Sequence, residues 1–222
     1  MMKHKVTQEL FAYWNALRDG RIAPTRGEIE PRDIRRILPY IFILERRDSW
    51  SYRFRLAGTG LCNIYGTEFR GHNMLNLWQS ECQSKMNQLL DDVVGSASVG
   101  LVDYTAETPD RREATLEMVL LPLAQDNGAI TRVLGAATPL DDLPWLGDYM
   151  LTRQWIGRAQ LIDPEKLAAV DPAREFARRI AREEPPRPTR IAGLGTRHVP
   201  LRTERPYLRL VKSETLKSED AN

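Results

Sequence analysis

The stretch YIFILERRDSWSYRFRLA, residues 40–57, carries the clearest strand signal in the chain. Residues 40–44 form an apolar run, which predicts a mostly buried strand. A charged turn at residues 45–48 follows, and beyond it apolar residues alternate with other residues, as in a half-buried strand. We therefore predict a β-hairpin whose second strand has one apolar face and one solvated face. The apolar face comprises Trp50, Tyr52, Phe54 and Leu56, and the solvated face comprises Ser51, Arg53, Arg55 and Ala57.

Two helices are expected before this hairpin. Leu10, Trp14 and Leu17 recur at the spacing of an amphipathic helix, which Asp19-Gly20 ends. Pro31 is suited to the first position of a second, short helix, and Pro39 would stop it. Its apolar side would carry Ile34, Ile37 and Leu38.

A helical segment and three further strands are expected after the hairpin. Leu61, Ile64 and Tyr65 indicate one short helical turn before Gly66. A helix of about fourteen residues begins at Cys82 and is closed by Gly95. Strands are predicted at residues 99–105, 114–124 and 130–138, and Asn127-Gly128 favours a tight hairpin between the last two. The predicted fold class is α+β, with a five-stranded antiparallel sheet, a helical crossover and an N-terminal helix.

The composition describes an ordinary globular protein. The chain has 222 residues, of which 42% are hydrophobic and 28% charged, and its net charge is +2. One domain with appendages fits this length, and the balanced charge argues against a dedicated nucleic-acid binder. Two cysteines are too few for a disulfide scaffold, and the charged N-terminus is unlike a signal peptide. No apolar run is long enough to span a membrane, so we expect a cytoplasmic protein.

The character of the sequence changes after Pro139. Residues 141–184 are predicted to form a helical and aromatic extension that packs back on the sheet. Asp163-Pro164 and Asp171-Pro172 each have the pattern of an N-cap followed by proline at the first helical position. Residues 185–222 contain the run Pro-Pro-Arg-Pro and are predicted to be a flexible, largely irregular tail. The N-terminal helical segment is assigned to residues 1–30 and the central domain to residues 31–140.

The central segment resembles a PAS domain in its order of elements and in its motifs. Two strands, a helical crossover and a three-stranded meander follow one another over about residues 31–140. The residues Glu68-Phe69-Arg70-Gly71 and Leu75-x-Leu77-Trp78 resemble the Gly-x-Glu-Leu-x-Gly signature of PAS crossovers. Leu120-Leu121-Pro122-Leu123 and Val133-Leu134-Gly135-Ala136 are similar to the last two strands of the small, stand-alone PAS proteins of alphaproteobacteria.

The resemblance implies a sensory or regulatory protein that contacts other signalling proteins rather than a catalyst. PAS domains bury a small ligand or a contact surface between the sheet and the crossover helices. The candidate lining is Phe54, Leu56, Trp78, Leu90, Val93, Leu120 and Leu134. The resemblance also implies a homodimer formed through the N-terminal helix, with Leu10, Phe11, Trp14 and Leu17 as the contact residues.

Few residues of the predicted domain could carry chemistry. His72 is the only histidine inside the domain, and it has no second ligand at metal-binding spacing. Neither Cys62 nor Cys82 lies in a flavin-binding motif, and no haem motif is evident, so the cofactor stays unknown. Asp91 and Asp92 diverge by about 100° on a helix and do not converge on one ion. We therefore expect no catalytic residue and no metal site.

The C-terminal arginines leave one alternative open. A flexible cationic segment could bind several phosphates, which would make the protein a nucleic-acid-associated regulator. Interspersed acidic residues such as Glu204 and Glu214 weaken that reading, and the same segment could bind an acidic protein surface. The candidate partner-binding arginines are Arg187, Arg190, Arg202 and Arg205.

Overall fold

The structure is a computed structural model that describes residues 1–170. The predictions made for Asp171-Pro172 and for the tail at residues 185–222 lie outside the described part of the chain. Helix α1 spans Lys5–Arg18, as the sequence predicts. His4 caps it by accepting a hydrogen bond from the Val6 amide at 3.1 Å, and Asp19 ends it in the left-handed conformation.

The second helix expected near Pro31 is not a helix. Residues 31–37 form consecutive turns, and two short 3₁₀ helices, η1 (Arg26–Glu28) and η2 (Leu38–Tyr40), lie on either side. Pro39 has no amide hydrogen to donate and disfavours the α conformation of the residue before it, so an α-helix begun at Pro31 could not continue past residue 38. Ile34 and Ile37 are nevertheless buried, so the apolar pattern identified core residues but not their conformation.

The predicted hairpin forms from β1 (Ile41–Asp48) and β2 (Ser51–Ala57), but residues 45–48, which were expected to form its turn, belong to β1, and the turn lies at residues 49–50. Its two faces differ from the expected alternation. The pairing shifts between Ile43 and Leu44, so that two residues of β2 lie opposite one position of β1, a β-bulge. The bulge turns Leu56 away from Phe54, leaving it 41% exposed, while Trp50 lies in the turn and is 52% exposed.

The crossover consists of α2 (Thr59–Tyr65), η3 (Met74–Leu77) and α3 (Ser80–Ser96). Gly66 ends α2 with a positive φ of 59°, in agreement with its predicted role. Gly95 does not end α3. The helix continues to Ser96, and Ala97 adopts the left-handed conformation that closes it.

The three strands expected next are β3 (Val99–Glu107), β4 (Glu113–Ala124) and β5 (Ile130–Pro139). The sheet contains a sixth strand that the sequence analysis missed, β6 (Arg153–Ile162), which pairs antiparallel with β3. Polar residues and Gly157, where the β3–β6 register shifts, obscure the alternation of β6. Helix α4 (Pro164–Val170) follows, and Asp163 accepts a hydrogen bond from the Glu165 amide as predicted.

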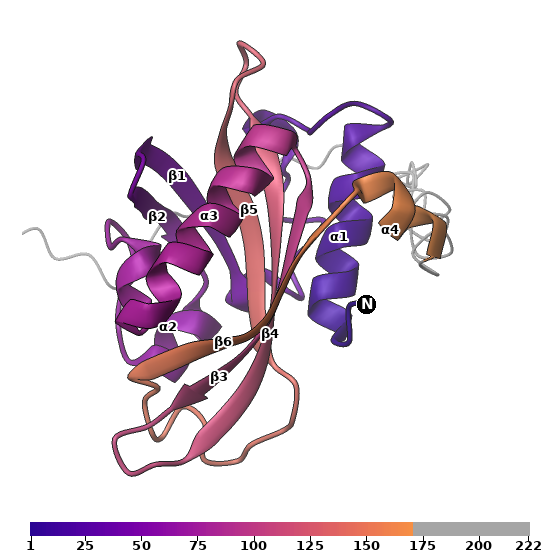
Figure 1. The fold of residues 1–222 in the computed structure, drawn as a ribbon. Helices are drawn as coiled ribbons and strands as arrows, with labels where there is room; N and C mark the ends of the chain where they lie inside the picture. The colour runs from indigo at the N-terminus through magenta and orange to yellow at the C-terminus, as the bar shows by residue number, and fades with distance from the viewer. Residues whose placement is uncertain (171–222) are drawn as a thin grey trace, which may run out of the picture. The chain divides into compact units, whose positions relative to one another are not determined.

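The strand order is β2-β1-β5-β4-β3-β6, and every pair is antiparallel (Figure 1). Successive residues of β4 enter two separate hydrophobic clusters, as the pleat of a strand requires. One cluster contains the buried residues of α2, η3 and α3, and we call it the α3-side core. The other contains those of α1, and we call it the α1-side core.

Candidate ligand-binding core

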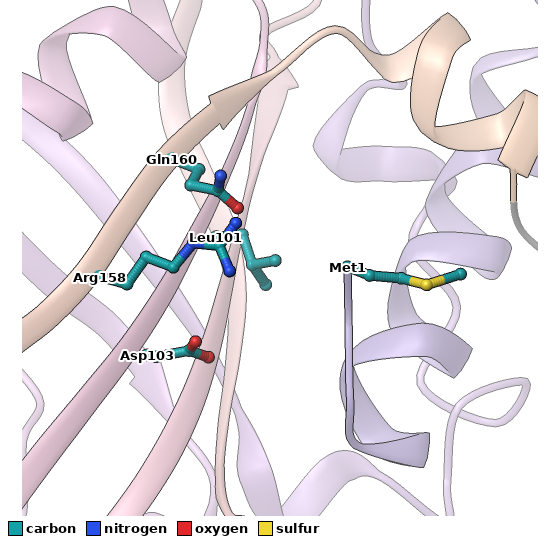
Figure 2. A pocket seen from close by; sticks show the side chains of 5 residues that line it. All are labelled: Met1, Leu101, Asp103, Arg158 and Gln160. Atoms are coloured by element: carbon teal, nitrogen blue, oxygen red, sulfur yellow. The ribbon is translucent and has the colours of Figure 1, made fainter.

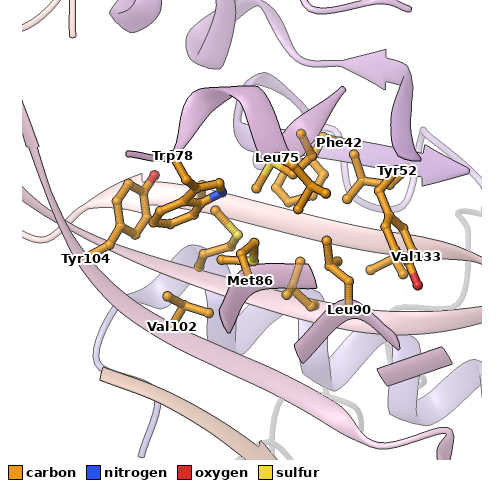
Figure 3. Close-up of a cluster of buried hydrophobic side chains, with 14 of the residues drawn as sticks. Phe42, Tyr52, Leu75, Trp78, Met86, Leu90, Val102, Tyr104 and Val133 are labelled. Carbon is orange, nitrogen blue, oxygen red and sulfur yellow. The ribbon is translucent and has the colours of Figure 1, made fainter. Parts of the chain in front are cut away.

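Five of the seven predicted lining residues meet in the α3-side core. Phe54 comes from β2, Leu120 from β4, Leu90 and Val93 from α3, and Trp78 from the residue after η3. Each is at most 3% exposed. Figure 3 shows part of this cluster, in which the side chains of the sheet face those of the crossover.

The other two predicted lining residues lie elsewhere. Leu134 is buried in the α1-side core, because β5 turns alternate residues to opposite faces and Leu134 pairs with Ile43, which faces α1. Leu56 is turned out of the α3-side core by the bulge in β2. The sequence located both strands, but it did not fix which residues face α3.

Aromatic rings fill much of the α3-side core. Phe54 stacks on Phe69 with ring centroids 4.9 Å apart, and it meets Phe42 edge-on at 5.7 Å. Trp78 meets Tyr104 in an edge-to-face arrangement at 5.2 Å. These are favoured geometries for aromatic pairs, and they fix the orientation of the Trp78 ring.

A polar cluster adjoins this aromatic core, in which Tyr104 and Gln154 are buried and Tyr65 is partly buried. The Tyr65 hydroxyl donates a hydrogen bond to Gln154 Oε1 at 2.6 Å and lies 3.3 Å from the Tyr104 hydroxyl. Burial raises the pKa of both tyrosines, so their hydroxyls stay protonated near neutral pH. Gln154 is 1% exposed, and its Nε2 group has no partner among the described residues.

Trp78 adds a second buried donor without an acceptor. The residue is 2% exposed, and its Nε1 has no hydrogen-bond partner in the described part of the chain. The nitrogen-bearing side of the indole is turned away from Tyr104 (Figure 3). An indole nitrogen can only donate, so an acceptor is required to satisfy it.

The sequence analysis missed three of the four polar residues. Tyr104 and Tyr65 were identified only as strand and helix residues, and their hydroxyls were not considered. Gln154 could not be placed, because β6 itself was not predicted. A tyrosine inside a predicted buried strand was the one available signal, since a buried hydroxyl usually has a hydrogen-bond partner.

The residues weighed for other chemistry are scattered. His72 is exposed in the loop after Gly71, whereas Cys82 is buried and accepts a hydrogen bond from the Ile156 amide. Asp91 Oδ1 lies 3.0 Å from Arg46 Nη2 and accepts a hydrogen bond from the Tyr52 hydroxyl at 2.7 Å. Within residues 1–170, no cluster of side chains has the composition of a metal site.

The residues predicted for dimer contact pack against other residues of the same chain. Leu10, Phe11 and Trp14 are fully buried in the α1-side core, and Leu17 is partly buried against it. They cover the sheet of their own chain, because the apolar side of α1 packs on β4 and β5. They are therefore not a free contact surface in this structure. The candidate arginines 187, 190, 202 and 205 lie outside the described residues.

Glu117 of β4 fastens α1 to the sheet. This carboxylate is fully buried, and it accepts hydrogen bonds from the Lys3 amide at 2.7 Å and the His4 amide at 3.0 Å. The Thr7 hydroxyl donates a further hydrogen bond to it. The N-terminal end of α1 is thus held by hydrogen bonds to a charged group, which are stronger than those between neutral groups.

A polar depression lies on the α1 side of the sheet, between the N-terminus and strands β3 and β6 (Figure 2). Its lining includes Asp103 and Arg158, which pair in register, and Asp103 also forms an ion pair with Lys3 at 2.8 Å. It is open to solvent and separate from the α3-side core. No helix among residues 1–170 is both long and apolar enough to cross a membrane.

Comparison with solved structures finds several that are distantly similar to part of this chain. A light-oxygen-voltage domain is 13% identical, with a TM-score of 0.41 over 50% of this chain and 84% of its own. The PAS domain of a protein from Colwellia psychrerythraea is 11% identical, with a TM-score of 0.38, and the match covers 49% of this chain and 94% of that domain. VqmA of Vibrio cholerae, in a complex with ligand and DNA, is 15% identical, with a TM-score of 0.41. The match covers 54% of this chain and 56% of VqmA.

A search of curated proteins finds no match to this chain. The family model described as "PAS domain" matches residues 2–138, a range that runs from the N-terminal segment containing α1 to β5. The match begins earlier than the resemblance seen in the sequence, which covered about residues 31–140. It spans more than half of the chain, which therefore belongs to the PAS domain family.

Proposed function

We propose that this chain is a non-catalytic regulatory protein of the stand-alone alphaproteobacterial PAS type. It acts in intracellular signalling through contacts with other proteins, and a small ligand between the sheet and the crossover helices gates those contacts. The observation that carries this proposal is the PAS family match over residues 2–138. The buried polar groups favour binding over catalysis, because phenols with a raised pKa, an amide and an indole are hydrogen-bonding groups rather than bases.

The contact between α2 and β6 supplies a route from ligand to surface. Tyr65 lies at the end of α2, and its hydroxyl donates to Gln154 of β6. The Gln79 amide, just before α3, donates to the Gln154 carbonyl oxygen at 3.2 Å. Because both crossover helices are tied to β6 in this way, a ligand that shifts the crossover also shifts the outer strand.

Exposed apolar side chains are the contact positions that we propose. Trp50 and Leu56 lie on the β1–β2 hairpin, Tyr149 precedes β6, and Leu161 lies near its end. Each is more than 40% exposed. We propose that these positions contact signalling proteins or a second copy of the chain in a cytoplasmic homodimer.

Site-specific photo-cross-linking tests the proposal. A photo-reactive phenylalanine analogue replaces Trp50, Leu56, Tyr149 or Leu161 in the full chain, expressed in the cells that make it. Asp126, in the exposed β4–β5 turn, is the matched control position. We expect a defined product, with a second copy or another protein, from at least one apolar position and not from position 126. No product from any apolar position, together with a monomer by light scattering at every concentration, would contradict the proposal.

A further inference from the structure

Arginines gather at one corner of the sheet, where β2, β1 and β5 lie side by side. Glu45 of β1 pairs in register with Arg53 of β2 and with Arg132 of β5, and residues opposite each other in a sheet lie on the same face. Glu45 Oε2 lies 2.7 Å from Arg47 Nη2 and 3.6 Å from Arg55 Nε. Glu45 Oε1 lies 3.3 Å from Arg132 Nη2. We call these four arginines the arginine patch.

The single carboxylate does not balance the arginine patch. A carboxylate accepts about four hydrogen bonds, fewer than the N–H donors of one guanidinium group. No acidic side chain of residues 1–170 other than Glu45 forms an ion pair with the patch. Asp48, at the end of β1, instead accepts a hydrogen bond from the Trp50 amide at 2.9 Å. Positive charge is therefore in excess at this corner of the sheet.

The arginine patch is open to solvent and has an apolar neighbour. The side chain of Arg47 is 51% exposed and that of Arg55 is 53% exposed. Leu56 pairs in register with Ile43, whose side chain lies in the α1-side core, so Leu56 shares the face of the patch. Helix α1 packs on β4 and β5, which leaves Leu56 exposed beside the arginines. The corner therefore offers both cationic and apolar groups to a partner.

The loop between β5 and β6, residues 140–152, has the opposite charge, and we call it the acidic loop. It contains no basic residue, and each of its acidic residues is exposed. These residues are Asp141, Asp142 and Asp148. Arg112 lies over the ring of Tyr149 in this loop, with its Cζ 4.0 Å from the centroid, but its Nε pairs with Asp110 at 2.8 Å. The negative charge of the acidic loop is therefore not neutralised by that arginine.

We propose that the arginine patch of one copy of the chain binds the acidic loop of a second copy. This inference rests on the proposed function, of which it specifies the contact between two copies. The two surfaces match in charge, and guanidinium groups pair with carboxylates in a geometry that favours two hydrogen bonds. They also match in apolar content. Trp50 and Leu56 of the hairpin and Tyr149 and Met150 of the acidic loop are each more than 40% exposed.

The positions of the two surfaces allow the contact to form twice. Arg132 lies near the start of β5, whereas the acidic loop follows the end of this strand, so the patch and the loop lie toward opposite ends of the sheet (Figure 1). Two copies placed side by side in opposite directions bring each patch to the loop of the other copy. A twofold axis then relates the two contacts, and the association closes as a dimer.

An exchange of charge between two variants tests the contact. Arg53→Glu combined with Arg55→Glu makes the patch acidic, and Asp141→Lys combined with Asp142→Lys makes the loop basic. Lys85→Glu, exposed on α3 at the other face of the sheet, is the control. The mass of the full chain is measured by light scattering and sedimentation over a range of protein and salt concentrations.

We expect the unaltered chain to associate, and its association to weaken as salt rises, because salt screens exposed charges. Each charge-reversed variant alone should have a dissociation constant at least about tenfold higher, because like charges face each other. An equimolar mixture of the two variants should associate again, because both contacts of the mixed dimer are complementary. That result would also show that both variants fold. Lys85→Glu should associate as the unaltered chain does.

A chain that is monomeric at every concentration would overturn the inference, as would folded variants that associate unchanged or a mixture of folded variants that stays monomeric. If Arg53→Glu with Arg55→Glu does not fold, Arg53→Gln with Arg55→Gln replaces it and should still weaken association. Cross-links between two copies from position 50 or 56 should map to residues 140–152. Cross-links to another protein from a monomeric chain would remove only this inference and leave the proposed function standing.

Discussion

The two faces of the sheet each bury a tryptophan, and the two indole N–H groups differ in their hydrogen bonding. On the α1 side, Trp14 is fully buried and its Nε1 donates to the Pro122 carbonyl oxygen at 2.8 Å. On the α3 side, Trp78 is 2% exposed and its Nε1 has no partner among residues 1–170. The two faces therefore differ in whether the chain itself supplies an acceptor to the buried indole.

The same difference extends to other polar groups. On the α1 side, Glu117 receives three hydrogen bonds and the Tyr13 hydroxyl accepts one from the Glu30 amide at 2.8 Å. On the α3 side, the Gln154 amide has one unpartnered group. The α1 side is not free of unpartnered groups, because Asp103 Oδ1 on that side also has no hydrogen-bond partner among residues 1–170.

The largest effect is expected from truncation within the α3-side core. Phe54→Ala removes a ring that contacts both Phe42 and Phe69, and it should lower the free energy of unfolding by about 3–5 kcal/mol. Leu56→Ala, two residues further along the same strand, should cost less than about 1 kcal/mol, because the bulge exposes Leu56. Urea unfolding measures both. Equal losses would mean that the bulge is absent in solution.

The next largest effect concerns the attachment of α1. Glu117→Gln keeps the size of the side chain but removes the charge that receives three hydrogen bonds. It should lower the free energy of unfolding by about 1.5–3 kcal/mol. Glu113→Gln on the same strand is exposed and should have almost no effect. Hydrogen exchange of the α1 amides measures the local loss, and unchanged protection in Glu117→Gln would contradict the assigned role.

Exchanging each tryptophan for phenylalanine tests the comparison directly. Trp14→Phe leaves the Pro122 carbonyl oxygen without its donor, whereas Trp78→Phe removes a donor that has no acceptor. Trp14→Phe should therefore be the more destabilising by about 1–3 kcal/mol, although both changes remove a similar volume. Thermal unfolding of the two variants gives the difference. If Trp78→Phe proved the more damaging, Trp78 would have an acceptor that this structure does not contain.

The smallest effect should come from pH. Burial lowers the pKa of His4 below its ordinary value of 6.5, so the unfolded chain binds a proton more readily than the folded one. Stability should accordingly fall as the pH drops through 6.5 and be constant above it. The loss should be smaller than those above, because solvent screens a partly exposed group. His4→Asn retains an N-cap acceptor and should flatten the pH profile measured by urea unfolding.

Periodicity located the elements of the PAS fold but not the details that form its site. The hairpin, α1, α3 and strands β3 to β5 were all predicted, because their apolar residues recur with the period of a strand or helix. The bulge at Leu56 and the facing of Leu134 depend on how strands register with one another, which sequence spacing does not encode. Strand β6 and the buried Gln154 escaped prediction because a polar residue in a core has no periodic signature.

The addition of β6 to β3 has a consequence for the association of sheets. A strand at the edge of a sheet offers unpaired amides and carbonyls to other chains. With β6 in place the two outer strands are β2 and β6, and β3, whose residues from Val99 to Glu107 pair with it, is covered. The outer strands carry arginines (Arg53 and Arg55 on β2, Arg153 and Arg158 on β6). Strand β6 therefore covers backbone groups of β3 that would otherwise be open to pairing with another chain.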